Sequence, residues 1–361
     1  MRKLEKAGES WRKKLLSLAA FSLIIPATIV SCGGGGGSSS ESSTTSTSTT
    51  TSTTQTTPVT YYGAASQGDL AKFTFDGQKV YYEVSGPVFG DKSGSFPVSV
   101  NVQKPFYKGD ADGTPVYLML SGNLAFADVI LDGKDTLVVG LRSSGGLTDS
   151  DVAGKKFVYV SVLSNGSVGG YTLELGTDHT WKLYDLEGNE EDSGTWQLVN
   201  GSYIKATDSS NNTYNVVVKP GTNRAGFVVD LAGSSVSGFG MGLEQKPLTK
   251  DDITGTYYYY SYDADNDEDC YGTVKVYYDA GSSAYRYDAK TVWCEDSEDV
   301  GLEETGTLTP NSPVDGVAKL TDPEGNEGYV FIDPEDGYFM AVKLKANGDI
   351  GEYIIGSSKT E

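Results

Sequence analysis

The residues with the clearest chemical potential are four aspartates at alternate positions just before Cys270. They are Asp263, Asp265, Asp267 and Asp269. Alternating carboxylates are typical of calcium-binding loops, but an EF-hand counted from Asp263 would have Glu268 instead of glycine at its sixth position and Val274 instead of glutamate at its twelfth. The segment is therefore no EF-hand. A looser calcium site and a solvated acidic turn remain as alternatives, and calcium is the one cofactor that the sequence suggests.

A tyrosine-rich run precedes these aspartates. Its members are Tyr257, Tyr258, Tyr259, Tyr260 and Tyr262. Successive side chains of a strand point to opposite faces, so this run predicts a strand that is aromatic on both faces. Because tyrosine combines a large apolar ring with a hydroxyl, the run is a candidate surface for binding a glycan or another ligand.

Catalytic chemistry has little support. The chain has one histidine, His179, in a predicted turn, whereas a serine or cysteine nucleophile usually takes its base from histidine and a zinc shell needs clustered ligands. Pairs of carboxylates are unavoidable among 49 acidic residues, so glycan hydrolysis by such a pair stays only as a remote alternative. We expect a non-catalytic protein.

The N-terminus predicts an export signal. Residues 1–14 carry six basic and two acidic side chains, and residues 15–30 are almost wholly apolar. This order is typical of a secretory signal, and the apolar stretch is shorter than the roughly 20 residues of a spanning helix. The sequence Ile29-Val30-Ser31-Cys32 then resembles the lipobox of bacterial lipoproteins. The resemblance implies a signal peptide over 1–31 and lipidation at Cys32, with palmitate among the expected acyl groups.

The segment after Cys32 predicts a tether. Residues 33–57 contain only glycine, serine, threonine, one glutamate and one glutamine, so they have no apolar area to offset the entropy of ordering. We expect residues 32–58 to form a disordered linker. Gly33, in place of an aspartate, resembles lipoproteins sorted to the outer membrane, and the expected location is that membrane, either on its periplasmic side or at the cell surface.

The two other cysteines are consistent with the expected location in the cell envelope. Cys270 and Cys294 lie 24 residues apart, and cysteines in an oxidising envelope compartment commonly pair. We predict a disulfide between them. The alternative is two reduced, buried thiols.

The rest of the chain has the pattern of an all-β protein. Short runs alternate apolar and polar residues, and candidate hairpin turns such as Asp132-Gly133 and Glu324-Gly325 separate them. Residues 147–154 and 248–255 share leucine, threonine, aspartate, an aliphatic residue and glycine at matching positions. Strands beginning at Tyr117, Tyr214 and Tyr329 are each followed by a turn and then by two more predicted strands. These repeats predict three modules, over 62–146, 147–247 and 248–361.

An antiparallel meander of seven or eight strands most simply closes into an up-and-down barrel. The sequence Asp252-Ile-Thr-Gly-Thr-Tyr257 resembles the start of the first strand of lipocalin-like (calycin) barrels, where a glycine, any residue and an aromatic open the sheet. The resemblance implies tandem lipocalin-like barrels. Open sandwiches and a β-propeller with two blades per repeat are the alternative folds.

The net negative charge limits the classes of partner that the protein can bind. Residues 248–361 contain 25 acidic and 8 basic side chains, and so carry −17 of the chain's net charge of −21. Nucleic acid is excluded by such a surface, and the predicted contact with a membrane is through the lipid anchor alone. Two classes of function remain: binding of a small apolar ligand or a glycan, and a structural or adhesive role in which the modules contact other surface proteins.

Overall fold

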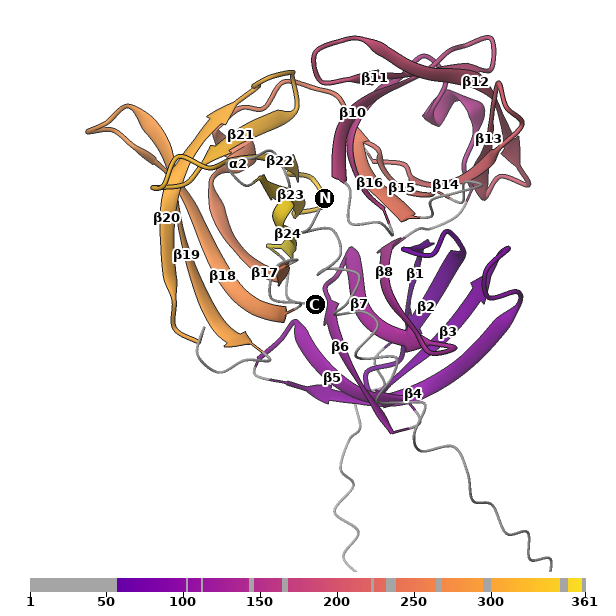
Figure 1. Ribbon diagram of the computed structural model, residues 1–361, viewed down its shortest axis with the longest axis horizontal. Helices are drawn as coiled ribbons and strands as arrows, with labels where there is room; N and C mark the ends of the chain where they lie inside the picture. The colour runs from indigo at the N-terminus through magenta and orange to yellow at the C-terminus, as the bar shows by residue number, and fades with distance from the viewer. Residues whose placement is uncertain are drawn as a thin grey trace, which may run out of the picture. The chain divides into compact units, whose positions relative to one another are not determined.

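A computed structural model describes residues 57–361, except for residues 102, 112, 143–145, 164–167, 222–223, 232–237, 264–267, 295–299, 345–349 and 359–361. The described chain forms three closed barrels of eight antiparallel strands each, which follow one another along the sequence (Figure 1). The predicted fold of tandem antiparallel barrels is confirmed. The open sandwich and the propeller are not formed by these residues.

Each barrel is a meander in which the last strand pairs with the first. Barrel 1 consists of β1 (Val59–Ala65), β2 (Leu70–Phe75), β3 (Lys79–Ser85), β4 (Lys92–Val100), β5 (Phe106–Ala111), β6 (Thr114–Leu120), β7 (Leu124–Leu131) and β8 (Lys134–Arg142). Barrel 2 consists of β9 (Lys156–Leu163), β10 (Val168–Leu175), β11 (Thr180–Asp185), β12 (Glu190–Val199), β13 (Tyr203–Asp208), β14 (Thr213–Lys219), β15 (Gly226–Asp230) and β16 (Gly238–Glu244). Barrel 3 consists of β17 (Gly255–Asp263), β18 (Glu268–Asp279), β19 (Ala284–Cys294), β20 (Glu303–Pro310), β21 (Val317–Thr321), β22 (Glu327–Asp333), β23 (Tyr338–Leu344) and β24 (Ile350–Ser357).

The strands beginning at Tyr117, Tyr214 and Tyr329 lie in β6, β14 and β22, which are the sixth strands of their barrels. Two strands follow each of them and close the barrel, through the pairs β1–β8, β9–β16 and β17–β24. Barrel 1 begins at Val59, three residues before the expected start of its module, and has as many strands as the other two. The expected module boundaries themselves remain predictions.

The repeated segments 147–154 and 248–255 form one capped helical turn before the first strand of their barrels. The turns are η1 (Asp149–Asp151) and α2 (Lys250–Ile253). In each, the aspartate of a capping box accepts a hydrogen bond of 2.7 Å from the threonine N–H, Thr148 to Asp151 and Thr249 to Asp252. Leu147 and Val152 are buried in the interior cluster of barrel 2, as Leu248 and Ile253 are in barrel 3, so each turn contributes apolar residues to its barrel core.

One hairpin in barrel 2 and one in barrel 3 are held by the same contact, in which an aspartate binds the asparagine four residues later. Asp208 accepts hydrogen bonds from the backbone N–H and the side-chain amide of Asn212, at 2.8 and 2.7 Å. Asp322 binds Asn326 in the same way, at 2.8 and 2.8 Å. Aspartate and asparagine favour turns because their side chains bond nearby backbone groups. The same local chemistry therefore fixes the turn between β13 and β14 and the turn between β21 and β22, the fifth and sixth strands of their barrels.

Two kinds of apolar core hold the molecule together. Inward-facing residues form an apolar cluster inside each barrel, and a further cluster is built from outward-facing residues of all three barrels, among them Phe106, Met241 and Tyr338. β7, β16 and β23 take part in this shared core, and their residues are apolar on both faces. Continuous apolar runs are expected of strands that are covered on both sides. We call this cluster the inter-barrel core.

The tyrosine-rich strand β17 divides its side chains between these two cores. Tyr257 and Tyr259 lie in the interior cluster of barrel 3. Tyr258, Tyr260 and Tyr262 lie on the other face and belong to or pack against the inter-barrel core. The rings of Tyr260 and Phe126 of barrel 1 are 4.5 Å apart. The strand is thus aromatic on both faces because both faces are packed.

One turn of barrel 3 makes polar contacts with both other barrels. In the segment between β22 and β23, the carbonyl of Asp336 accepts a hydrogen bond of 2.9 Å from Asn123 of barrel 1, and its carboxylate pairs with Lys219 of barrel 2. Glu335 accepts a bond of 3.1 Å from the N–H of Arg224. Burial raises the pKa of the neighbouring Asp333 carboxyl to about 6. The junction therefore contains a titratable group that is held away from water.

We expect Asp333→Asn to alter how stability depends on pH. The folded pKa of about 6 lies above the ordinary value of 3.8. The carboxyl's contribution to the free energy of unfolding is therefore fully present below about pH 4 and is lost as the pH rises through about 6. Asparagine does not titrate, so the wild type should lose about 2–3 kcal/mol relative to the variant between about pH 4 and pH 7.

Urea denaturation at a series of pH values measures this difference. Asparagine can still accept, through Oδ1, the bonds of 3.0 and 3.2 Å that the N–H groups of Glu335 and Asp336 donate to Asp333. Glu324→Gln, at an exposed turn position, is the matched control and should follow the wild type. If the free energies of unfolding of Asp333→Asn and wild type differ by the same amount at every pH, the expectation is wrong.

Candidate functional site

The best candidate for a site is a partly enclosed cavity of about 140 Å³ inside barrel 2. Its lining comes from seven of the eight strands and is mostly aliphatic and aromatic. The lining residues are Tyr159, Leu173, Leu175, Trp181, Leu183, Asp192, Ile204, Ala206, Tyr214, Val216, Phe227, Val229 and Leu231. Most of them belong to the interior cluster of the barrel or pack against it. Small-molecule sites are typically concave and apolar with a few placed polar groups, and this cavity has that character.

The eighth strand, β16, makes room for the rings. Its sequence Gly238-Phe-Gly-Met-Gly-Leu243 alternates glycine with large apolar residues, and the large residues face the inter-barrel core. A Cβ atom added at Gly240 would lie 3.0 Å from the Tyr159 ring, and one added at Gly242 would lie 2.3 Å from the Tyr159 Cβ. Since a side chain at either position would displace Tyr159, the inward glycines fix where this cavity wall stands.

Hydrogen bonds hold two of the aromatic side chains. The Tyr214 hydroxyl donates to Asp208 Oδ2 at 3.0 Å, and Trp181 Nε1 donates to the carbonyl of Thr207 at 3.2 Å. Burial raises the pKa of Tyr159 and of Tyr214 well above the ordinary value of a phenol, and the hydrogen bond to Asp208 raises that of Tyr214 further. The phenols therefore stay protonated at neutral pH and can act as neutral donors and acceptors.

The predicted tyrosine surface is largely covered. Tyr257, Tyr259 and Tyr260 are buried, while Tyr258 and Tyr262 are partly exposed beside the inter-barrel core. This packing accounts for the aromatic run without a ligand. A role for these five residues in binding stays a prediction.

The four aspartates of the calcium hypothesis are described only in part. Asp265 and Asp267 lie outside the described residues, and of Asp263 only the backbone is described, at the end of β17. Asp269 lies in β18 opposite Tyr262, and its side chain is buried. Within the described part of the chain, no group of three or more histidine, cysteine, aspartate or glutamate side chains could hold a metal ion. The calcium site stays a prediction.

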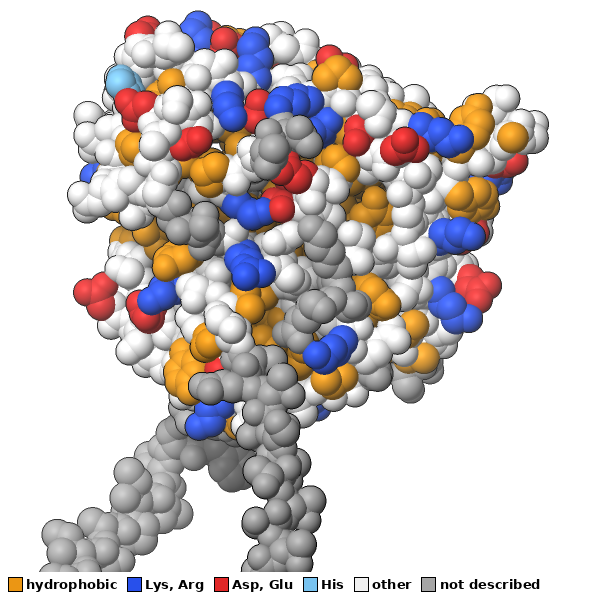
Figure 2. Space-filling view, turned by 180° about the vertical axis from the view of Figure 1, so that it is seen from behind, with side chains coloured by type: hydrophobic (Ala, Val, Ile, Leu, Met, Phe, Trp, Pro, Cys, Tyr) orange, Lys and Arg blue, Asp and Glu red, His pale blue; other side chains and the backbone are white. Residues whose placement is uncertain are grey.

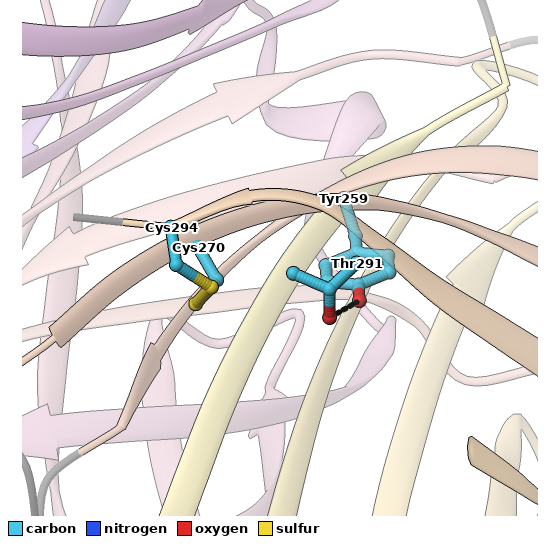
Figure 3. The surroundings of a disulfide bond; sticks show 4 residues. All are labelled: Tyr259, Cys270, Thr291 and Cys294. Carbon is cyan, nitrogen blue, oxygen red and sulfur yellow. Dashed lines mark hydrogen bonds between the residues drawn. A yellow bond between two sulfur atoms is a disulfide. The ribbon is translucent and has the colours of Figure 1, made fainter. Parts of the chain in front are cut away.

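Cys270 and Cys294 form a disulfide, with Cα atoms 4.1 Å apart across the ladder of β18 and β19. Figure 3 shows it beside a hydrogen bond of 3.3 Å between Tyr259 of β17 and Thr291 of β19. The next residues inward, Tyr271 and Trp293, face each other in the same ladder, with rings 4.9 Å apart. The bridge therefore secures the end of the strand pair that presents these rings to barrel 1. Cys32, the predicted lipidation site, lies outside the described residues.

His179 lies in the expected turn. It has a left-handed backbone conformation, with φ at 62°, and its Nε2 atom is 3.1 Å from Asp149 Oδ2. Its ring packs edge-on against Trp196, with the centroids 4.4 Å apart. These contacts explain the residue as part of the packing at one end of barrel 2.

The outer faces of the strands carry solvated charge pairs. Lys182 and Glu190 are 2.8 Å apart across β11 and β12, and Lys290 and Glu303 are 2.7 Å apart across β19 and β20. Such exposed pairs contribute little to stability. On the face drawn in Figure 2, acidic and basic side chains are interspersed with hydrophobic ones, as on an ordinary solvated surface. No helix among the described residues is long and apolar enough to cross a membrane.

Sequence reasoning did not find the cavity residues Tyr159, Trp181 and Asp192. They lie on three different strands, β9, β11 and β12, and belong to no motif, so nothing in the sequence indicates that they line one space. One signal was available: three glycines at alternate positions of a strand indicate that the facing side chains are large. Gly238, Gly240 and Gly242 carry that signal.

Neither a family model nor a curated protein sequence matches the chain. Among solved structures, the chain is similar to a protein of unknown function from the DUF3598 family of Nostoc punctiforme PCC 73102. The two are 11% identical, the match covers 59% of this chain and 97% of that one, and the TM-score is 0.24. It is also similar to a mutant of the vaccine antigen transferrin binding protein B from Haemophilus parasuis Hp5, at 12% identity over 84% of this chain and 76% of that one, with a TM-score of 0.23. Intact Ap-TbpB, with its N and C lobes, matches at 10% identity over 84% and 77% of the two chains, with a TM-score of 0.25. At these TM-scores, nothing about those proteins is carried over to this chain.

Proposed function

We propose that this chain is a non-catalytic binding protein of the bacterial cell envelope, anchored by lipid at Cys32, whose second barrel binds a small apolar molecule. The cavity in barrel 2 is the observation that supports a small apolar ligand. The proposed location in the cell envelope is supported by the resemblance of residues 29–32 to a lipobox, which is followed by a polar tether. The tether would hold the barrels away from the lipid surface, where a diffusible ligand can reach them.

The interior of a barrel is a better binding site here than the tyrosine strand. Three of its five tyrosines are buried, so the strand offers a glycan little flat aromatic surface. The cavity, in contrast, is lined by apolar side chains and is open on part of its boundary. Transfer of an apolar ligand from water into such a space is favourable by about 25 cal/mol per Å² of buried apolar surface.

We expect toluene, as a simple apolar probe, to stabilise the wild-type protein and not a variant with a filled cavity. Ala206→Leu adds three carbons to an inward-facing residue of the cavity wall. A ligand that binds only the folded state at 100 times its Kd stabilises by about 2.7 kcal/mol. Thermal melting of wild type and variant with increasing toluene measures the effect.

Thr195→Leu is the matched control, because it introduces the same side chain on the exposed, outward face of the same barrel. It should respond to toluene as the wild type does. Equal stabilisation of the Ala206→Leu variant would place the binding elsewhere, and no stabilisation of the wild type would refute the cavity as an apolar site.

A further inference from the structure

The cavity of barrel 2 contains a single charged group. Among the described residues that line it, Asp192 alone has an ionisable carboxyl, and the other twelve are aliphatic or aromatic. Asp192 lies in β12 opposite Leu183 of β11, which also lines the cavity. The carboxylate is therefore part of the binding surface and not of the solvated exterior of the barrel.

The protein does not neutralise this carboxylate with a cation in the described part of the chain. The hydrogen bond that Asp192 makes there comes from the N–H of Ser193, at 2.7 Å to Oδ1. The neighbouring lysine, Lys182, is on the outer face and pairs with Glu190. The carboxylate lines the cavity together with Tyr159 and Tyr214. Its charge adds to the burial and the nearer partners that raise the pKa of both hydroxyls.

Aromatic rings surround the same space. Tyr159 and Phe227 pack edge to face with centroids 5.4 Å apart, and Trp181 and Tyr214 do so at 6.5 Å. The faces of such rings attract cations, and ammonium groups are commonly bound in cages of aromatic side chains. Asp192 is partly exposed, and a carboxylate at the wall of an apolar cavity attracts a cation of opposite charge.

We infer that the ligand of barrel 2 is an apolar molecule with one ammonium group, whose apolar part fills the cavity and whose cation binds beside Asp192. This inference rests on the proposed function, because it specifies the chemistry of the same site. A cavity of about 150 Å³ is known to hold one benzene ring. A volume of about 140 Å³ therefore suits one ring or a short alkyl segment, with the rest of a larger ligand at the open side.

Three probes of equal size test the inference: benzylamine, which is protonated at neutral pH, benzyl alcohol and benzoate. Isothermal titration of the purified chain should give an affinity for benzylamine roughly 10- to 100-fold above that for benzyl alcohol, as expected for a charge-assisted contact, with benzoate the weakest. Asp192→Asn should remove most of the advantage that benzylamine has over benzyl alcohol.

The outcomes separate the two proposals. If benzyl alcohol binds and benzylamine binds no more tightly to the wild type, the inference is wrong and the apolar site stands. If none of the three probes binds, the proposed function fails together with the inference. The comparison of probes on the wild type needs no variant, so a folding defect in Asp192→Asn, which circular dichroism would reveal, does not block the test. An unchanged preference for benzylamine in a folded Asp192→Asn protein would overturn the role of this carboxylate.

Discussion

Replacing Phe106 with alanine should lower the free energy of unfolding by about 3–5 kcal/mol, the usual cost of removing a fully buried phenylalanine. Phe106 lies on the outer face of barrel 1 and is 0% exposed. Its ring stacks on Tyr271 of barrel 3, with the centroids 4.4 Å apart and an angle of 4° between the planes. The loss would come from a cavity in the inter-barrel core, where the surrounding side chains can collapse only partly. Urea denaturation followed by circular dichroism measures it.

Tyr81→Ala is the control for this experiment. It also removes an aromatic ring from barrel 1, but Tyr81 is 45% exposed, and its substitution should change stability by no more than about 0.5 kcal/mol. If both substitutions had the same small effect, packing between the barrels would not contribute to stability, and the inter-barrel core would be refuted. A large effect of Phe106→Ala alone would establish that the barrels fold against one another.

Replacing both Cys270 and Cys294 with alanine should destabilise the protein by about 3.5 kcal/mol, the chain-entropy value for a closed loop of about 25 residues. The bridge joins β18 and β19 beside Tyr271 and Trp293, which pack against Phe106 and Tyr117 of barrel 1. Without the bridge, the unfolded chain has more conformational freedom, and unfolding therefore becomes more favourable. Denaturation of wild type and double variant under non-reducing conditions measures the difference.

Reductant provides the internal control for the disulfide. It should bring the wild type close to the double variant and leave the double variant unchanged. Mass measurement after alkylation, with and without reduction, counts the thiols independently. Two alkylated cysteines in the unreduced wild type, or equal unfolding midpoints for wild type and double variant, would contradict the prediction.

Local features of the sequence were enough to predict the strands and many of the turns. Asp132-Gly133 forms the expected hairpin between β7 and β8, with both residues in the left-handed region, because glycine and aspartate adopt that conformation at low cost. Glu324-Gly325 similarly lies between β21 and β22. Asn165-Gly166 and Asn347-Gly348, which have the residue types of hairpin turns, lie outside the described residues.

A glycine before an alternating strand does not identify the position of that strand in a barrel. Gly154 and Gly255 come at or just before the start of the first strands of barrels 2 and 3, but Gly77 comes before β3, the third strand of barrel 1. A glycine followed by an alternating strand recurs at nearly every hairpin, so the pattern cannot specify which strand of a barrel it begins. The tyrosine-led sixth strands aligned correctly because a turn and two further strands followed each of them.

The sequence by itself determined the all-β class and the repeated meander of seven or eight strands, and it predicted the cysteine pair, since alternation, turn residues and composition are properties of short segments. The tertiary structure alone decided that each meander closes, which face of the tyrosine-rich strand enters the barrel and which meets barrel 1, and that Tyr159, Trp181 and Asp192 share one cavity. The physical reason is that a strand pattern reveals which residues avoid water but not what covers them. Closure pairs strands from opposite ends of a module, and the covering partner can lie more than a hundred residues away, as Phe106 does from Tyr271.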